Sequence, residues 1–190
     1  MLTAEQIHAN ELEYLRLLSK LGVDLTNFNK FLDEVDFFNK PASVSYAGAY
    51  PGGLCEYALK FINNLNALCA YYYNGRYSEE DLIKVALLKD IYRAVMYEYY
   101  LKNVKDDATG QWTTVGAFKT KEGSARPVFG DLGMSSYMIA KNFFDFTDEQ
   151  IEAIIHAAPF ETGIDIHDIM RQYPLVALTK MAGVGATYLK

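Results

Sequence analysis

The chain has 190 residues, enough for one compact domain with a single sizeable core. Hydrophobic residues make up 51% of the chain and charged residues 22%, which is the composition of an ordinary soluble globular protein. The net charge of −6 gives no general attraction to nucleic acid or to an anionic membrane. It therefore argues against a dedicated DNA-binding protein, but it is compatible with a local basic groove.

The chain shows no targeting or membrane-spanning signal. Its first fifteen residues are amphipathic and acidic, without the apolar core of a signal peptide, and no apolar run approaches the ~20 residues of a membrane span. Cys55 and Cys69 form no CxxC motif, and on one helix they would lie ~21 Å apart, too far for a disulfide. We expect two free thiols in a cytoplasmic protein.

The first 36 residues predict two helices. Thr3 is a suitable N-cap, Gln6 completes a capping box, and an apolar stripe follows as far as Gly22. A second apolar stripe with helical spacing follows Asp24. The glycine- and proline-containing segment 39–53 is then too long for a simple connector, which is typical of a functional loop.

The rest of the sequence predicts further helices and one β-hairpin. A long helix is expected from Leu54 to Tyr73, and another is expected to begin after Ser78 and continue towards Tyr100. Broken periodicity and several glycines over about residues 103–128 predict a small hairpin. Three more helices are expected at 131–145, at 147–158 with Thr147 as N-cap, and at 174–189. The expected fold is a mainly α single domain with an inserted hairpin.

Several short motifs occur in the order found in one family. These are Pro41-Ala-Ser43, Gly48-Ala-Tyr-Pro-Gly-Gly-Leu54, Ala86-Leu-Leu-Lys-Asp90, Ser135-Ser-Tyr-Met-Ile139, Ala153-Ile-Ile-His156 and Ala186-Thr-Tyr188. Over about residues 31–190 the chain resembles the HD-domain metal-dependent phosphohydrolases of phages and prophages, and is similar to the HD domain of certain 3′–5′ exoribonucleases. The resemblance implies an HD-domain-like helical bundle, with its core over residues 37–190.

The same resemblance implies a divalent metal held by His and Asp side chains, and this chain departs from that pattern. The family's GGLxEH motif has Tyr57 for its His, the His-Asp doublet reads Lys89-Asp90, and a Gly-His-Gly-Glu stretch has Asp131 and Gly133 for its His and Glu. A late Asp is replaced by Gly183, and a His of the loop by Ala47, whereas His156 is retained. A phenol or an ammonium cannot replace a neutral imidazole ligand.

Lys89 allows two interpretations. Its ammonium beside Asp90 would take the place and charge of the missing metal, in an ion-pair network that also includes Asp131 and His156. In the other interpretation Lys89 points outward and Asp90 only makes local hydrogen bonds. Lys89, Lys105, Lys119 and Arg126 are also candidates for binding an anion, or they form a solvated face.

Two functions follow as expectations. The first is a catalytically inactive HD-like protein of phage or prophage origin, without a cofactor, that binds a protein partner or a nucleotide in the host cytoplasm. Its tyrosine-rich segments, such as Tyr71-Tyr-Tyr73, would suit a partner surface. The alternative is a divergent phosphohydrolase acting on nucleotides or RNA, in which Asp90, Asp131 and His156 hold a weak metal such as Mn or Ni. The partner and the oligomeric state stay open.

Overall fold

Local capping chemistry sets the start of several helices. In the computed structural model, which describes residues 1–122, 131–158 and 166–189, Thr3, Ser78 and Thr147 each accept a hydrogen bond from the backbone of the third helical residue. That residue's side chain accepts one in return from the backbone of the cap, so each helix starts at a complete capping box. The helices predicted to begin after Thr3, Ser78 and Thr147 are therefore confirmed at their N-termini.

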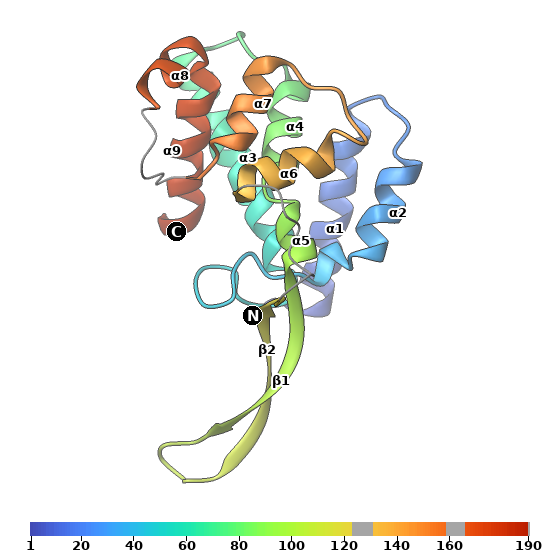
Figure 1. Ribbon diagram of the computed structural model, residues 1–190, viewed down its shortest axis with the longest axis vertical. Helices are drawn as coiled ribbons and strands as arrows, with labels where there is room; N and C mark the ends of the chain where they lie inside the picture. Colours follow the sequence, from blue (N-terminus) through green and yellow to red (C-terminus); the bar gives the residue numbers. More distant parts are fainter. Residues whose placement is uncertain (123–130, 159–165, 190) are drawn as a thin grey trace.

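The fold is mainly helical and carries one two-stranded antiparallel hairpin (Figure 1). In chain order the elements are α1 (Ala4–Ser19), α2 (Thr26–Glu34), the 3₁₀ turn η1 (Phe37–Asn39), α3 (Gly53–Tyr72), α4 (Glu79–Leu88), α5 (Tyr92–Met96), β1 (Tyr97–Lys105), β2 (Trp112–Thr120), α6 (Leu132–Ala140), α7 (Asp148–Ile155), α8 (His167–Gln172) and α9 (Pro174–Tyr188).

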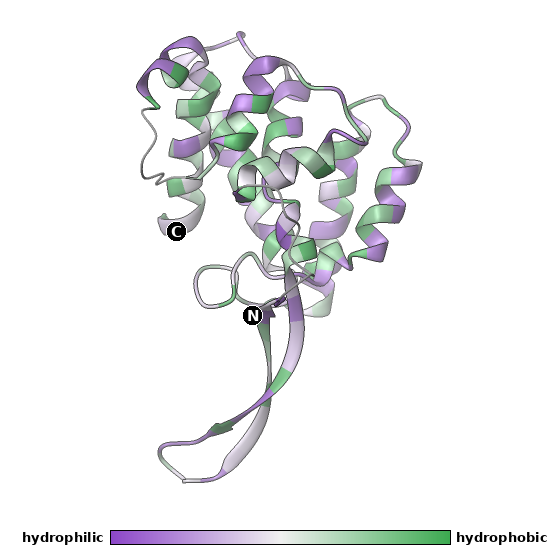
Figure 2. Ribbon diagram, in the orientation of Figure 1, coloured by the Kyte–Doolittle hydropathy of each residue, from purple (hydrophilic) through white to green (hydrophobic). Residues whose placement is uncertain are grey.

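The core is built around α3. This helix packs against α1, α4 and α9, and its residues Phe61 and Leu65 are completely buried. The helices carry hydrophobic and hydrophilic residues on different sides (Figure 2), as expected where one face is buried. Tyr14 of α1 is also fully buried, and its hydroxyl donates a 2.8 Å hydrogen bond to the backbone oxygen of Leu87 in α4. One polar contact therefore ties the N-terminal helix to the core.

The hairpin projects from one end of the helical body (Figure 1). Its strands pair only with each other in the described structure, from Tyr97 opposite Thr120 to Lys105 opposite Trp112. Tyr97 at its root is buried, but residues 101–116 are all exposed. Burial of apolar surface is the main source of folding stability, so most of the hairpin adds little to the stability of the body.

Shortening this hairpin is expected to leave the fold intact. Replacing residues 100–117 with an Asn-Gly turn keeps the buried root and the Tyr99–Phe118 ring contact, whose centroids lie 5.5 Å apart. The melting temperature should change by no more than about 2–4 °C, the shift that corresponds to ~1 kcal/mol in a chain of this size. Circular dichroism melts check this, and a loss of more than about 10 °C would show that the hairpin supports the body.

Some predicted boundaries are wrong. The helix after Ser78 does not continue towards Tyr100, because α4 ends at Leu88 and the chain is already in β1 from Tyr97. The hairpin consequently starts six residues before the predicted residue 103, and β2 ends at Thr120; residues 123–128 lie outside the described part. The helix predicted over 131–145 ends at Ala140. The short helix α8 was not predicted.

Both cysteines lie on α3, are buried and form no disulfide, as predicted. Burial raises the pKa of the Cys55 thiol to about 12, with Glu11 and Glu56 adding to the effect. Such a thiol is protonated at neutral pH and unreactive. Within the described residues no helix is long and apolar enough to cross a membrane.

Candidate functional site

Lys89 lies inside the protein and not on its surface. It follows the last residue of α4, only 4% of its surface is exposed, and its ammonium donates a hydrogen bond to Asp90 Oδ2. The same ammonium lies 4.2 Å from the ring centre of Phe61 and 4.9 Å from that of Tyr57. Two aromatic faces and one carboxylate therefore surround the cation, an arrangement that stabilises a desolvated ammonium. The ion pair with Asp90 that the sequence suggested is present.

Arg93 completes this ion-pair network. Its Nε donates a 2.8 Å hydrogen bond to Asp90 Oδ1, so both oxygens of that carboxylate are bound by cations. Its Nη1 donates to the backbone oxygen of Ala42 at 2.8 Å and to the hydroxyl of Tyr97 at 3.2 Å. Arg93 thus links Asp90 to the 39–53 loop and to the root of the hairpin.

The two cations decide the protonation of Asp90. Burial alone would raise the pKa of the carboxyl, but the charges of Lys89 and Arg93 outweigh burial and hold that pKa well below its usual range. Burial likewise opposes the charge of Arg93, and Asp90 and Tyr97 overcome it, so the pKa of the guanidinium is raised. Asp90 is consequently an anion throughout the physiological pH range.

A small cavity, the Lys89 cleft, lies beside this network. Its volume is about 80 Å³, and it is lined by Tyr57, Lys89, Asp90, Arg93, Leu132, Gly133, Ala157 and Ala158. Gly183 of α9 lies behind Tyr57, and a Cβ built on it would be 3.8 Å from the tyrosine hydroxyl. A methyl group at Gly183 would therefore make only an ordinary van der Waals contact with the phenol of Tyr57.

The other sequence candidates do not join the network. Asp131 is exposed and caps α6, accepting a 2.8 Å hydrogen bond from the backbone nitrogen of Met134. His156 is buried at the end of α7, and its Nε2 lies 3.2 Å from a carboxylate oxygen of Glu152. The extended network that was to include Asp131 and His156 is therefore not formed in the described structure.

Gly133, where the sequence resemblance implies a Glu, has no room for any side chain. A Cβ on this residue would lie 2.0 Å from the backbone oxygen of Ile155. This close approach brings α6 onto the end of α7, so the glycine has a packing role here.

The predicted anion-binding residues are not gathered at the Lys89 cleft. Lys105 is exposed at the far end of β1, and Lys119 on β2 pairs with Glu98 at 3.1 Å. Arg126 lies outside the described residues. Of the members of this set that the structure describes, only Lys89 lines the cleft, where it is already paired with Asp90.

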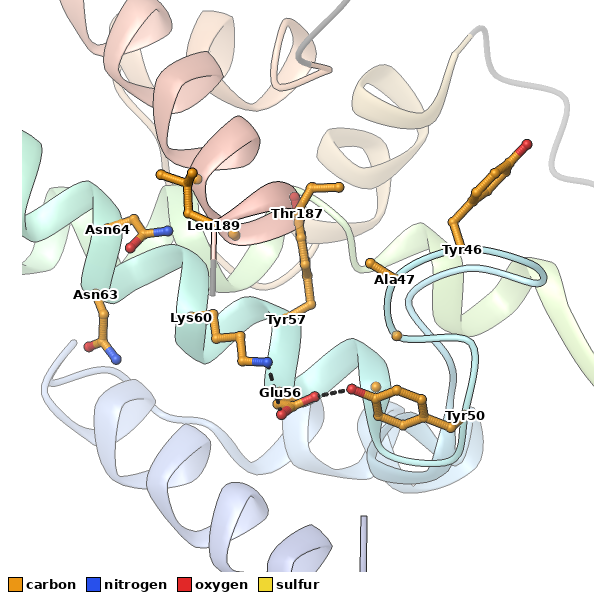
Figure 3. A pocket seen from close by; sticks show the side chains of 14 residues that line it. Tyr46, Ala47, Tyr50, Glu56, Tyr57, Lys60, Asn63, Asn64, Thr187 and Leu189 are labelled. Carbon is orange, nitrogen blue, oxygen red and sulfur yellow. Dashed lines mark hydrogen bonds and ion pairs between the residues drawn. The ribbon is translucent and has the colours of Figure 1, made fainter. Parts of the chain in front are cut away.

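A much larger cavity, the loop pocket, is also lined by Tyr57 (Figure 3). Its volume is about 710 Å³. The 39–53 loop forms one wall and the C-terminal end of α9 the opposite wall, while the side chains of Glu56, Tyr57, Lys60, Asn63 and Asn64 line it from α3. These positions recur on one face of the helix, because residues four apart lie one turn apart. Tyr57 lines both cavities.

The charged groups of the loop pocket are already paired. Lys60 lies 3.0 Å from Glu56, and the hydroxyl of Tyr50 donates a 2.5 Å hydrogen bond to the same carboxylate (Figure 3). Partial burial and the hydrogen bond to Glu56 raise the pKa of Tyr50 to about 12. The sequence singled out the loop as functional but did not place α9 opposite it, so the pocket itself was missed.

The donor set does not suit a divalent metal. Within residues 1–122, 131–158 and 166–189, no three His, Cys, Asp or Glu side chains are grouped so that they could hold a metal ion. Asp90, the best-placed carboxylate, is bound through both oxygens. A comparison with protein-family models found no match, and no curated protein and no solved structure matches the chain.

Proposed function

We propose that this protein is a catalytically inactive relative of HD-domain phosphohydrolases, of phage or prophage type, that acts by binding and not by hydrolysis. The observation that carries the proposal is the ion-pair network of Lys89, Asp90 and Arg93. A metal-dependent hydrolase needs a carboxylate free to bind its cation, and here both oxygens of Asp90 are bound by side chains of the chain itself.

The positions of the remaining family ligands support the same reading. The phenol of Tyr57 and the ammonium of Lys89 lie where the resemblance implies imidazoles, and Lys89 is within 5 Å of the Tyr57 ring centre. A buried ammonium repels a second cation at this distance. Asp131 serves as a helix cap, and His156 pairs with Glu152. The residues that are present therefore do not fit the family's metal.

A protein that does not hydrolyse a ligand can still bind one, and the proposed partner is a nucleotide or a protein. The loop pocket, with about 710 Å³, is within the size range of small-molecule sites in proteins. Exposed aromatic side chains, among them Tyr71, Tyr72 and Trp112, are of the type enriched in protein interfaces.

Metal content and hydrolysis test the proposal together. The purified chain is incubated with Mn²⁺, Ni²⁺ or Zn²⁺, its bound metal is measured by mass spectrometry, and its melting temperature is recorded. A metal that binds only the folded state at a hundred times its dissociation constant adds about 2.7 kcal/mol of stability. We expect no stoichiometric metal, no such shift, and no turnover of bis(4-nitrophenyl) phosphate.

The variant Asp131→Asn tests the alternative function, a divergent hydrolase in which Asp131 binds the metal. Asparagine caps a helix as well as aspartate does, so the variant removes the proposed ligand charge without harming α6. Near-stoichiometric metal, together with hydrolysis that Asp131→Asn abolishes, would replace the proposal with a hydrolase that uses Asp90, Asp131 and His156.

A further inference from the structure

The volumes of the Lys89 cleft and of the loop pocket limit the size of the ligand that each cavity can hold. The Lys89 cleft has about 80 Å³, whereas small-molecule sites generally have about 300–1,000 Å³. The loop pocket has about 710 Å³ and is also lined by Tyr57. Of these two cavities, the loop pocket is the one that has room for a ligand of nucleoside size.

The wall of the loop pocket is built before any ligand arrives. The backbone nitrogen of Ala42 donates to the oxygen of Gly48 at 2.9 Å, and that of Leu54 donates to the oxygen of Lys40 at 3.0 Å. Gly53 lies so close to Gly48 that a Cβ on Gly53 would be 2.2 Å from the Gly48 oxygen. A preformed wall lowers the entropy cost of binding.

The charges of the pocket argue against an anionic ligand. Its only charged described lining residues are Glu56 and Lys60, which form an ion pair 3.0 Å long. A phosphate group would need a cationic partner, and it would have to break this pair to obtain one. The net charge of −6 on the whole chain adds a general repulsion of anions.

The unused hydrogen-bonding groups of the pocket are neutral. The side-chain amides of Asn63 and Asn64 and the hydroxyl of Tyr57 make no hydrogen bond within the described part of the chain. An asparagine amide presents a donor and an acceptor side by side, which pairs with the edge of a nucleobase. The rings of Tyr50 and Tyr57 line the pocket, and such rings stack on planar heterocycles, whereas the ring of Tyr46 is 84% exposed and points away from the cavity (Figure 3).

We propose that the loop pocket binds an uncharged nucleoside or nucleobase, with Asn64 pairing to the base edge and the tyrosine rings contacting its faces. The inference rests on the proposed binding function and gives that function a ligand class. It assigns the site to α3, the 39–53 loop and the end of α9, and it leaves the Lys89 cleft without a ligand.

Titration of the full chain with the four ribonucleosides and their 5′-monophosphates, followed by ligand-detected NMR and calorimetry, tests this site. We expect saturable binding of at least one nucleoside, with an affinity no lower than that of its 5′-monophosphate. Asn64→Ala should weaken binding about ten-fold, roughly the value of a bidentate amide–base pair. Asn66→Ala is the matched control, since Asn66 is on the same helix but does not line the pocket.

A second variant, Gly185→Ala, distinguishes the loss of the Asn64 contact from misfolding of Asn64→Ala. In Gly185→Ala the new Cβ would lie 2.9 Å from the Asn64 amide nitrogen, so the amide must move while its chemistry is kept. This variant should also lose about ten-fold in affinity. The site is overturned if no nucleoside binds, if the monophosphate binds more tightly than the nucleoside, or if Asn64→Ala loses no more affinity than Asn66→Ala.

The results for nucleoside binding and for metal-dependent hydrolysis test the ligand of the loop pocket and the inactive-enzyme proposal independently. Nucleoside binding together with metal-dependent hydrolysis would keep the loop pocket and overturn the inactive enzyme. No nucleoside binding and no metal would overturn the pocket's ligand and keep the inactive enzyme.

Discussion

Asp90→Asn is expected to lower the free energy of unfolding by about 3–5 kcal/mol at pH 7, the range measured when one partner of a buried ion pair is removed. The reason is that the variant leaves two cations without their carboxylate partner. Lys89 is 4% exposed and would lose the one carboxylate that is paired with it among the described residues, and Arg93 would lose the same partner. Urea unfolding of the variant and the parent protein measures the difference.

An exposed ion pair provides the control for this experiment. Arg16 lies 2.7 Å from Glu13 on the surface of α1, so Arg16→Met should cost less than about 1 kcal/mol. Lys89→Met should cost less than Asp90→Asn, because Asp90 keeps Arg93 and the methionine fills similar space. If Asp90→Asn costs no more than Arg16→Met, the network is not a buried charge cluster.

The pH dependence of this difference has a defined sign. The pKa of Asp90 is lower in the folded protein than its ordinary value of about 3.9, so its charge contributes stability at pH values above the unfolded pKa. That contribution is lost as the pH falls below about 4 towards the folded pKa. The stability gap between the parent protein and Asp90→Asn should therefore be constant from pH 5 to 7 and shrink in stronger acid.

Gly133→Ala is expected to destabilise the protein by about 3 kcal/mol, at the upper end of the range for overpacked positions. Its Cβ would lie 2.0 Å from the backbone oxygen of Ile155, and a backbone atom cannot move aside as a flexible side chain can. Because α6 rests on the end of α7 at this point, the two helices must separate. Thermal melts and urea unfolding should both show the loss.

Gly183→Ala is the matched comparison, because Gly183 is also a buried glycine within a helix. A Cβ there meets its nearest neighbour at 3.8 Å, an ordinary van der Waals contact. Alanine is favoured over glycine within a helix by about 1 kcal/mol, so this variant should be neutral or up to that much more stable. Equal effects of the two substitutions would contradict the packing described for α6 and α7.

The sequence was a good guide wherever structure depends on neighbours along the chain. The capping boxes of Thr3 and Thr147 each need only residues three apart and are present as predicted, and the helix expected after Ser78 also starts there, with a capping box of its own. The contact of Lys89 with the adjacent Asp90, one of the two interpretations that the sequence left open, is also present. Arg93, three residues beyond Asp90, was missed although its i,i+3 spacing was readable from the sequence.

Predictions failed where the deciding partner is distant in the chain. The segment from Tyr97 to Leu101 continues a helical pattern, yet it pairs with residues 116–120 of β2. Aromatic residues favour strands, and a strand partner is available only through the hairpin. The loop pocket was missed for a similar reason, because it forms only where the 39–53 loop faces the end of α9.

The position of Lys89 also has a consequence for how the protein depends on its surroundings. An ammonium covalently attached to the chain neutralises Asp90 in every molecule, with an occupancy that no change in ion concentration can alter. A cation taken from solution would instead couple the amount of folded protein to the supply of that ion by mass action. The interior of this protein therefore carries its own counter-ion for Asp90, and the stability that this ion pair contributes should not depend on the supply of metal ions.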